Sequence, residues 1–154
     1  MFRNIKYGLK NLIKWFPTIW NDRDWDYCFL YDLLYFKLKN MEKFQRKYGH
    51  SVSNEEIANE IKPCIEVLGR LIEDDYKDEV WLALRERWGA FEFEDCEDKP
   101  GYSKLVIPGV KTEEDRKEYR ADIKRCVDSE EEAIQKDLSL LFDTMKENIR
   151  KWWD

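Results

Sequence analysis

The side chains best suited to chemistry in this sequence gather near its beginning, where basic and aromatic residues are interleaved. Residues 1–20 carry four basic side chains and no acidic one. An aromatic ring can stack on a nucleobase, contributing about 1–3 kcal/mol per base, while ammonium and guanidinium groups bind phosphate. The candidate ligand-binding residues of this segment are Arg3, Lys6, Lys10, Lys14, Trp15 and Trp20.

A second, smaller group has the same chemistry and consists of Arg85, Arg87 and Trp88. Together the two groups predict a surface for a small nucleotide-type anion. The alternative is that aromatic residues at helical spacing pack into the core while the long basic side chains cover the outside. The sequence leaves open whether the first aromatic residues belong to the core or to a site.

The distribution of charge limits the kinds of molecule that the protein can bind. The chain has 154 residues and a formal net charge of −6. Outside residues 1–20 there are 23 basic and 33 acidic side chains, so a segment of charge +4 precedes a body of charge −10. An acidic body repels the phosphate backbone of nucleic acids. We therefore expect no general binding of duplex nucleic acid, whereas a small anion at the basic segment is compatible with these charges.

Patterns for metal binding are weak. Asp22, Asp24 and Asp26 resemble the opening of a calcium loop, but Tyr27 and Leu33 occupy the positions that need glycine and glutamate. The four cysteines are spaced by 36, 32 and 30 residues, so no pair has the close spacing of zinc ligands. We expect no metal and no cofactor, and we expect reduced cysteines in a cytosolic protein.

Two further sets of ionisable residues could act in catalysis or form ion pairs. His50 is the single histidine, and it lies in a turn without a nearby nucleophile pattern. Glu130 and Asp137 fall within an apolar stripe, where an unpaired carboxylate is costly. We expect them to pair with Lys37 or Lys47 or to lie at a site. No catalytic motif stands out, so we predict that the protein is not an enzyme.

Apolar periodicity predicts a mainly α-helical protein that positions these residues. With only six glycines and four prolines, the chain is poor in the residues that turn-rich β folds require. The expected helices cover residues 3–16, ending at Pro17, then 21–48, 53–76 with Pro63 inside, 78–88 and 112–152. Residues 90–111 lose the helical period and predict an irregular loop or small hairpin.

The segment 112–152 keeps one apolar phase throughout, which favours a single helix of about 40 residues. Ser129 and Glu132 form a possible capping box, so a break near residue 128 is the alternative. The fold prediction is an all-α, single-domain elongated bundle with this long C-terminal helix and a small insertion near 90–111. Apolar stretches fall short of the roughly 18 residues of a membrane span. Lys10 and Lys14 interrupt the one stretch that could be a signal peptide.

Five short segments of the sequence are distinctive: NLIKWFPTIWNDRDWD at 11–26, YDLLYFKLKNMEKF at 31–44, RLIEDDY at 70–76, RWG at 87–89 and the closing KDLSLLFDTMKENIRKWWD. Together they resemble a widespread family of small uncharacterised bacteriophage proteins. The resemblance covers almost the whole chain. It implies expression in the cytoplasm of an infected bacterium, and it transfers no catalytic residue.

The leading functional hypothesis is a non-enzymatic bacteriophage accessory protein that counters host defence. It would bind and sequester a small nucleotide-type signal, or a host factor, through the nine candidate residues. The alternative is a protein–protein interaction or homo-oligomerisation module whose C-terminal helix presents Trp152 and Trp153 to a partner. A metal-dependent enzyme that uses the acidic residues is the least favoured reading.

Overall fold

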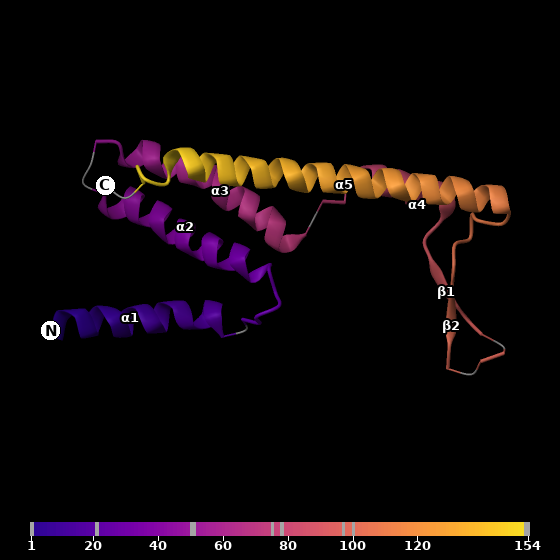
Figure 1. Cartoon of the computed structure of the whole chain (residues 1–154), viewed down its shortest axis with the longest axis horizontal. Coiled ribbons are helices and arrows are strands. Elements are labelled where there is room, and N and C mark those ends of the chain that lie inside the picture. The colour runs from indigo at the N-terminus through magenta and orange to yellow at the C-terminus, as the bar shows by residue number, and fades with distance from the viewer. Residues whose placement is uncertain are drawn as a thin grey trace. The chain divides into compact units, whose positions relative to one another are not determined.

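The structure is a computed structural model, and it describes residues 2–20, 22–49, 52–74, 76–77, 79–96, 98–99 and 101–152. Within these residues the chain is mainly helical and has one two-stranded sheet, as predicted (Figure 1). The elements, in chain order, are α1 (Phe2–Ile19), α2 (Phe29–Tyr48), α3 (Asn54–Glu73), α4 (Glu79–Trp88), β1 (Glu92–Asp95), β2 (Ser103–Val106) and α5 (Glu113–Asn148).

The chain divides into two compact units. The first unit comprises Met1–Asp75 and Asp137–Asp154, and therefore contains α1, α2, α3 and the end of α5. The second unit, Tyr76–Lys136, contains α4, the two strands and the beginning of α5. That the chain forms a single domain stays a prediction.

The core of the first unit is built on the apolar stripe of α3, which packs against α2. Apolar residues three and four positions apart lie on one helical face, so a continuous stripe can be buried along its length. The buried residues of α3 are Ile57, Ala58, Ile61, Cys64, Val67, Leu68 and Leu71. Leu38 of α2, Leu141 of α5 and Trp152 complete the core. As predicted, α3 is one helix with Pro63 inside it.

Several predicted boundaries in the first unit are wrong, and α3, for one, ends at Glu73 instead of at residue 76. Pro17 does not end α1, because its ring crowds only the preceding turn and the N–H of Trp20 still donates to the carbonyl of Phe16 at 3.0 Å. The helix predicted to begin near residue 21 begins instead at Phe29. Before it, Oδ1 of Asp26 accepts the N–H of Cys28 at 3.0 Å, a local bond that competes with helix formation.

In the second unit, α4 ends where predicted, at Gly89 with φ +82°. The left-handed backbone there favours glycine, which has no Cβ. Of the two alternatives predicted for residues 90–111, the structure has the small hairpin: β1 and β2 are antiparallel, with Phe93 opposite Leu105. The N–H of Gly109 donates to the carbonyl of Trp88 at 2.8 Å, which ties the chain after the hairpin back to the end of α4.

The long C-terminal helix is continuous through residue 128 (Figure 1). A capping box begins it, because the N–H of Asp115 donates to Oγ1 of Thr112 at 3.1 Å and the N–H of Thr112 donates to Oδ2 of Asp115 at 2.8 Å. The helix ends at Asn148, four residues earlier than predicted. Because it belongs to both units, it contributes side chains to each.

Candidate functional site

The candidate residues of α1 are not one surface. Lys6 and Lys10 are exposed, and Trp20 is 66% exposed while it packs on Phe16 with ring centroids 4.7 Å apart. Trp15 instead packs edge-on against Phe36 of α2 at 4.6 Å. Trp15 is therefore part of the contact between α1 and α2, which is the core role that the sequence left open. The side chain of Arg3 lies outside the described residues.

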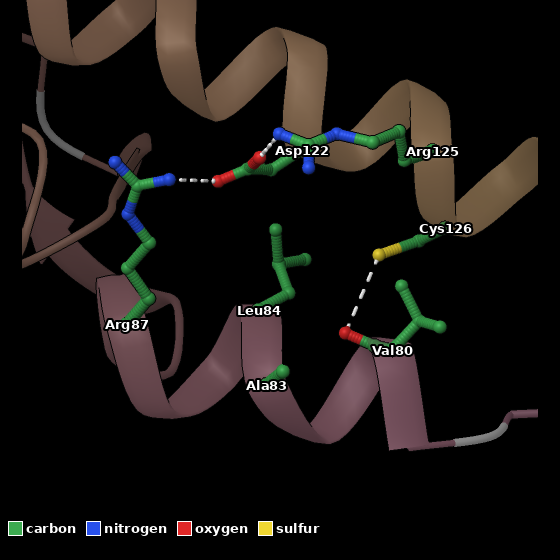
Figure 2. A pocket seen from close by; sticks show the side chains of 7 residues that line it. All are labelled: Val80, Ala83, Leu84, Arg87, Asp122, Arg125 and Cys126. Carbon is green, nitrogen blue, oxygen red and sulfur yellow. Dashed lines mark hydrogen bonds and ion pairs between the residues drawn. The ribbon is translucent and has the colours of Figure 1, made fainter.

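The predicted cluster at the end of α4 is a closed network of charges (Figure 2). Nη1 of Arg87 donates to Oδ2 of Asp122 at 2.8 Å, and Arg125 pairs with the other oxygen of the same carboxylate. Arg87 also pairs with Glu118. A hydrogen bond from Trp88, followed by the charges of Arg125 and Arg87, lowers the pKa of Asp122 below its ordinary value.

Trp88 is not available for stacking on a ligand. Its side chain is 5% exposed, and its Nε1 donates to Oδ2 of Asp122 at 2.8 Å. Its ring contacts Tyr119 and lies under the guanidinium of Arg87. The prediction of a stacking surface at Trp88 is therefore wrong, because the indole is used to join α4 to α5.

A small cavity of about 200 Å³ lies beside this network (Figure 2). It is lined by Val80, Ala83, Leu84, Arg87, Asp122, Arg125 and Cys126. Its two arginines already pair with carboxylates, so an incoming anion would have to displace those carboxylates. Arg85 faces a different cavity of about 380 Å³, with Lys77, Phe91 and Tyr119 among its lining residues.

The largest of the three cavities lies in the first unit, has a volume of about 550 Å³ and is formed by residues of α1, α2 and the C-terminal end of the chain. We call it the α1–α2 cavity. Its lining residues are Lys14, Leu34, Lys37, Leu38, Asn40, Met41, Phe44, Gln45, Met145, Ile149 and Trp152. Cavities of 300–1,000 Å³ with mostly apolar walls and a few polar groups are typical of small-molecule sites.

Gln45 is the unusual residue of this wall. It is 3% exposed, and its Nε2 donates to the backbone carbonyl of Trp152 at 3.0 Å. Because a carbonyl only accepts, this bond fixes the orientation of the amide. Oε1 then has no hydrogen-bond partner among the described residues. A buried acceptor without a partner costs about 1–3 kcal/mol.

Two lysines supply the charge of the cavity. Lys14 of α1 places its Nζ 5.8 Å from the ring centroid of Phe36, and Lys37 lies on α2. Both side chains are exposed, and neither forms an ion pair with the described carboxylates. Unlike Arg87 and Arg125, these ammonium groups are free to bind an anion.

The carboxylates within the apolar stripe of α5 have structural partners other than those predicted. Asp137 accepts two hydrogen bonds from Arg70, at 2.8 and 2.7 Å, so its partner is neither Lys37 nor Lys47. Oε2 of Glu130 accepts the indole N–H of Trp81 at 3.1 Å. Among the described residues, no three His, Cys, Asp or Glu side chains are grouped to hold a metal ion. His50 lies outside the described residues.

The predicted presentation of Trp152 to a partner is also wrong. The side chain is 1% exposed, and its Nε1 donates to Oε2 of Glu60 at 3.0 Å. Trp153 lies outside the described residues. Within the part of the chain that the structure describes, no helix has the length and apolar composition needed to cross a membrane.

Sequence reasoning found Lys14 but missed most of the α1–α2 cavity. Lys37 carried a signal, because it interrupts the apolar arc of α2. Gln45 carried none, since a polar residue near the end of a helix is ordinarily exposed. No protein-family model, curated protein or solved structure matches the chain. The resemblance to bacteriophage proteins therefore stays a prediction, and the evidence for a site is the geometry of the α1–α2 cavity.

Proposed function

We propose that this protein is a non-enzymatic binding protein that captures a small nucleotide-type anion in the α1–α2 cavity. The observation that carries the proposal is the unpartnered Oε1 of Gln45, buried in a cavity wall that also holds Lys14 and Lys37. Buried acceptors without a partner are uncommon in native proteins, and a donor on a ligand would satisfy this one.

The three kinds of group in the wall are complementary to the polar edge of a base, to its flat ring and to phosphate. An amino or imino N–H of a base can donate to Gln45, and Lys14 and Lys37 can bind phosphate. The side chains of Met41 and Phe44 provide an apolar surface for the flat ring. An aliphatic acid would satisfy the lysines and the apolar wall but would bring no donor for Gln45, which favours the nucleotide class.

Sequestration of such a signal suits the expected setting of the protein. In the cytoplasm of an infected bacterium, a bacteriophage protein that holds a host nucleotide signal would counter a defence that depends on it. The wall of the cavity offers ammonium groups, an amide acceptor and apolar side chains, which are groups that hold a ligand. This supports binding as the function we propose.

Isothermal titration and thermal shift against a panel of cyclic and ADP-ribose-type nucleotides test the proposal. We expect at least one member to bind and to raise the midpoint of thermal unfolding. Replacing Lys14 or Lys37 by glutamine removes a charged contact with phosphate, so we expect about tenfold weaker binding for each.

Matched variants separate this cavity from general electrostatic attraction. Lys10→Gln changes the same charge on the same helix, and Lys43→Gln does so on α2, yet neither residue lines the cavity. Both controls should bind with nearly unchanged affinity. Absence of binding across the panel, or equal losses in Lys14→Gln and Lys10→Gln, would contradict the proposal.

A further inference from the structure

The apolar face of α1 is largely exposed. This face, which we call the outer arc, consists of Ile5, Leu9, Leu12, Ile13 and Phe16, spaced three and four residues apart. Each of these side chains is more than half exposed, and Ile13 is 76% exposed. The helix instead meets α2 through Trp15 and Lys14, which both contact Phe36. Its most apolar stripe therefore faces away from α2.

The outer arc is bordered by positive charge. Lys6 and Lys10 are exposed on α1, and the sequence of Phe2–Ile19 contains no aspartate or glutamate. Trp20, at the end of the helix, is also exposed. Lysines beside an apolar stripe that contains phenylalanine and leucine, with tryptophan at the end, are the pattern of helices that lie in the plane of a membrane surface.

We infer that α1 docks on an anionic lipid bilayer through the outer arc, with Lys6 and Lys10 at the headgroups. Charge complementarity selects this occupant. Pairing two copies through the same arc would bring their flanking lysines together, whereas phosphate headgroups attract them. The helix would lie at the interface without crossing the bilayer, because Lys6, Lys10 and Lys14 place a charge in successive turns.

This inference goes beyond the proposed capture of a nucleotide and uses different side chains. The outer arc, Lys6 and Lys10 do not line the α1–α2 cavity. A helix that lies on a membrane surface needs aromatic residues that are not used for burial against the body. Among the described side chains of residues 4–20, Trp15 packs on α2, whereas Phe16 and Trp20 are exposed.

Vesicle co-sedimentation of the full chain tests the docking. We expect the protein to bind vesicles of phosphatidylcholine containing about one third phosphatidylglycerol, and to bind pure phosphatidylcholine much more weakly. Raising the salt from about 0.1 M to about 0.5 M should release it from the anionic vesicles. Lys6→Glu and Lys10→Glu should each weaken binding by at least about fivefold.

Ile13→Gln tests the apolar contribution, and we expect it to weaken vesicle binding about tenfold. Because Ile13 is mostly exposed, this variant should keep the stability of the parent. Lys104→Glu and Leu105→Gln are the matched controls, since both change exposed residues of β2. They should bind vesicles like the parent.

Three results would overturn the inference. The first is that the protein does not bind vesicles at any phosphatidylglycerol content. The second is that the control variants in β2 lose as much vesicle binding as the variants in α1. The third is a mass in light scattering that rises with protein concentration and falls in Ile13→Gln, without vesicle binding. That result would assign the outer arc to contact between copies of the chain.

Discussion

Replacing Gln45 by methionine tests whether the buried oxygen of the α1–α2 cavity is unpaired. Methionine has nearly the same volume and flexibility but no amide, so the variant leaves the packing of the cavity wall almost unchanged. Two effects on the free energy of unfolding then oppose each other. One is the loss of the bond from Nε2 to the carbonyl of Trp152, and the other is the removal of the unpartnered Oε1.

The magnitudes of these effects are similar. Losing the bond leaves the carbonyl of Trp152 without its side-chain donor, which costs about 1–3 kcal/mol. Removing a buried acceptor that has no partner returns about the same amount. We therefore expect Gln45→Met to change the free energy of unfolding by less than about 1 kcal/mol. If both amide atoms of Gln45 were paired, the substitution would clearly lower the free energy of unfolding. The loss of the hydrogen bond would then not be offset by the removal of an unpaired oxygen.

Urea unfolding followed by circular dichroism measures this difference, provided that the slope with denaturant is unchanged. Gln135→Met is the matched control, because Gln135 is exposed on α5 and bonds only to Glu131. It should also stay within about 0.5 kcal/mol of the parent. In titrations with a nucleotide that binds the parent, Gln45→Met should bind at least tenfold more weakly while Gln135→Met does not.

A loss of more than about 2 kcal/mol in Gln45→Met would refute the reasoning, because Oε1 would then have a partner in the free protein. Unchanged nucleotide affinity in a variant of normal stability would refute the role of Gln45 in binding. The two readouts are independent, so they distinguish a paired Oε1 in the free protein from a ligand that does not contact Gln45.

Two further predictions test the packing and capping of α5. Leu141 is fully buried whereas its neighbour Leu140 is about half exposed, so Leu141→Ala should lower the free energy of unfolding by about 2–5 kcal/mol and Leu140→Ala by less than about 1 kcal/mol. Equal losses in urea unfolding would contradict the orientation of α5. The backbone N–H groups of Thr112 and Lys111 lower the pKa of Asp115 in the folded protein. The contribution of Asp115 to stability is therefore complete above the pKa that this residue has in the unfolded chain, and it is lost as pH falls through the lower pKa of the folded protein. Asp115→Asn should reduce the loss of stability below about pH 4, and the control Asp143→Asn should reduce it less. Thermal melts measure the unfolding midpoint of each variant across that pH range. If the midpoints of Asp115→Asn and the parent fall equally with pH, the cap contributes nothing.

The parts of the fold that the sequence predicts are those fixed by local periodicity. The stripe of α3, from Ile57 to Leu71, repeats with the helical period and is buried as one face. The capping pair of Thr112 and Asp115 begins α5 at the predicted position, and Gly89 follows the last residue of α4. In each case residues within one or two turns determine the outcome, so no knowledge of distant contacts is needed.

The errors at α1 and α2 arise where two local effects compete. Proline both disfavours the helix before it and permits a further turn after it, and in α1 the second effect prevails as far as Ile19. The acidic residues before α2 suit a helix N-terminus, but the side chain of Asp26 bonds to the backbone of Cys28 and makes a turn. Propensity alone does not determine which outcome has the lower free energy.

The α1–α2 cavity could not be predicted because its wall combines residues far apart in the sequence. Gln45 meets the carbonyl of Trp152, 107 residues away, and the same wall includes Lys14. The burial of Gln45 follows from the docking of the C-terminal turn on α2, which no local pattern specifies. For the same reason the sequence could not decide which aromatic residues of α1 pack inward.

The two proposed binding events both involve α1. Lys14 faces the α1–α2 cavity, while the outer arc on the other side of the helix carries the proposed membrane contact. Trp15 and Lys14 pack on Phe36 and so join α1 to α2. If one ligand changes the affinity for the other, linkage requires the same factor in both directions. Titration of a nucleotide in the presence and absence of anionic vesicles therefore measures the coupling, and equal affinities in the two titrations would show that the two sites are independent.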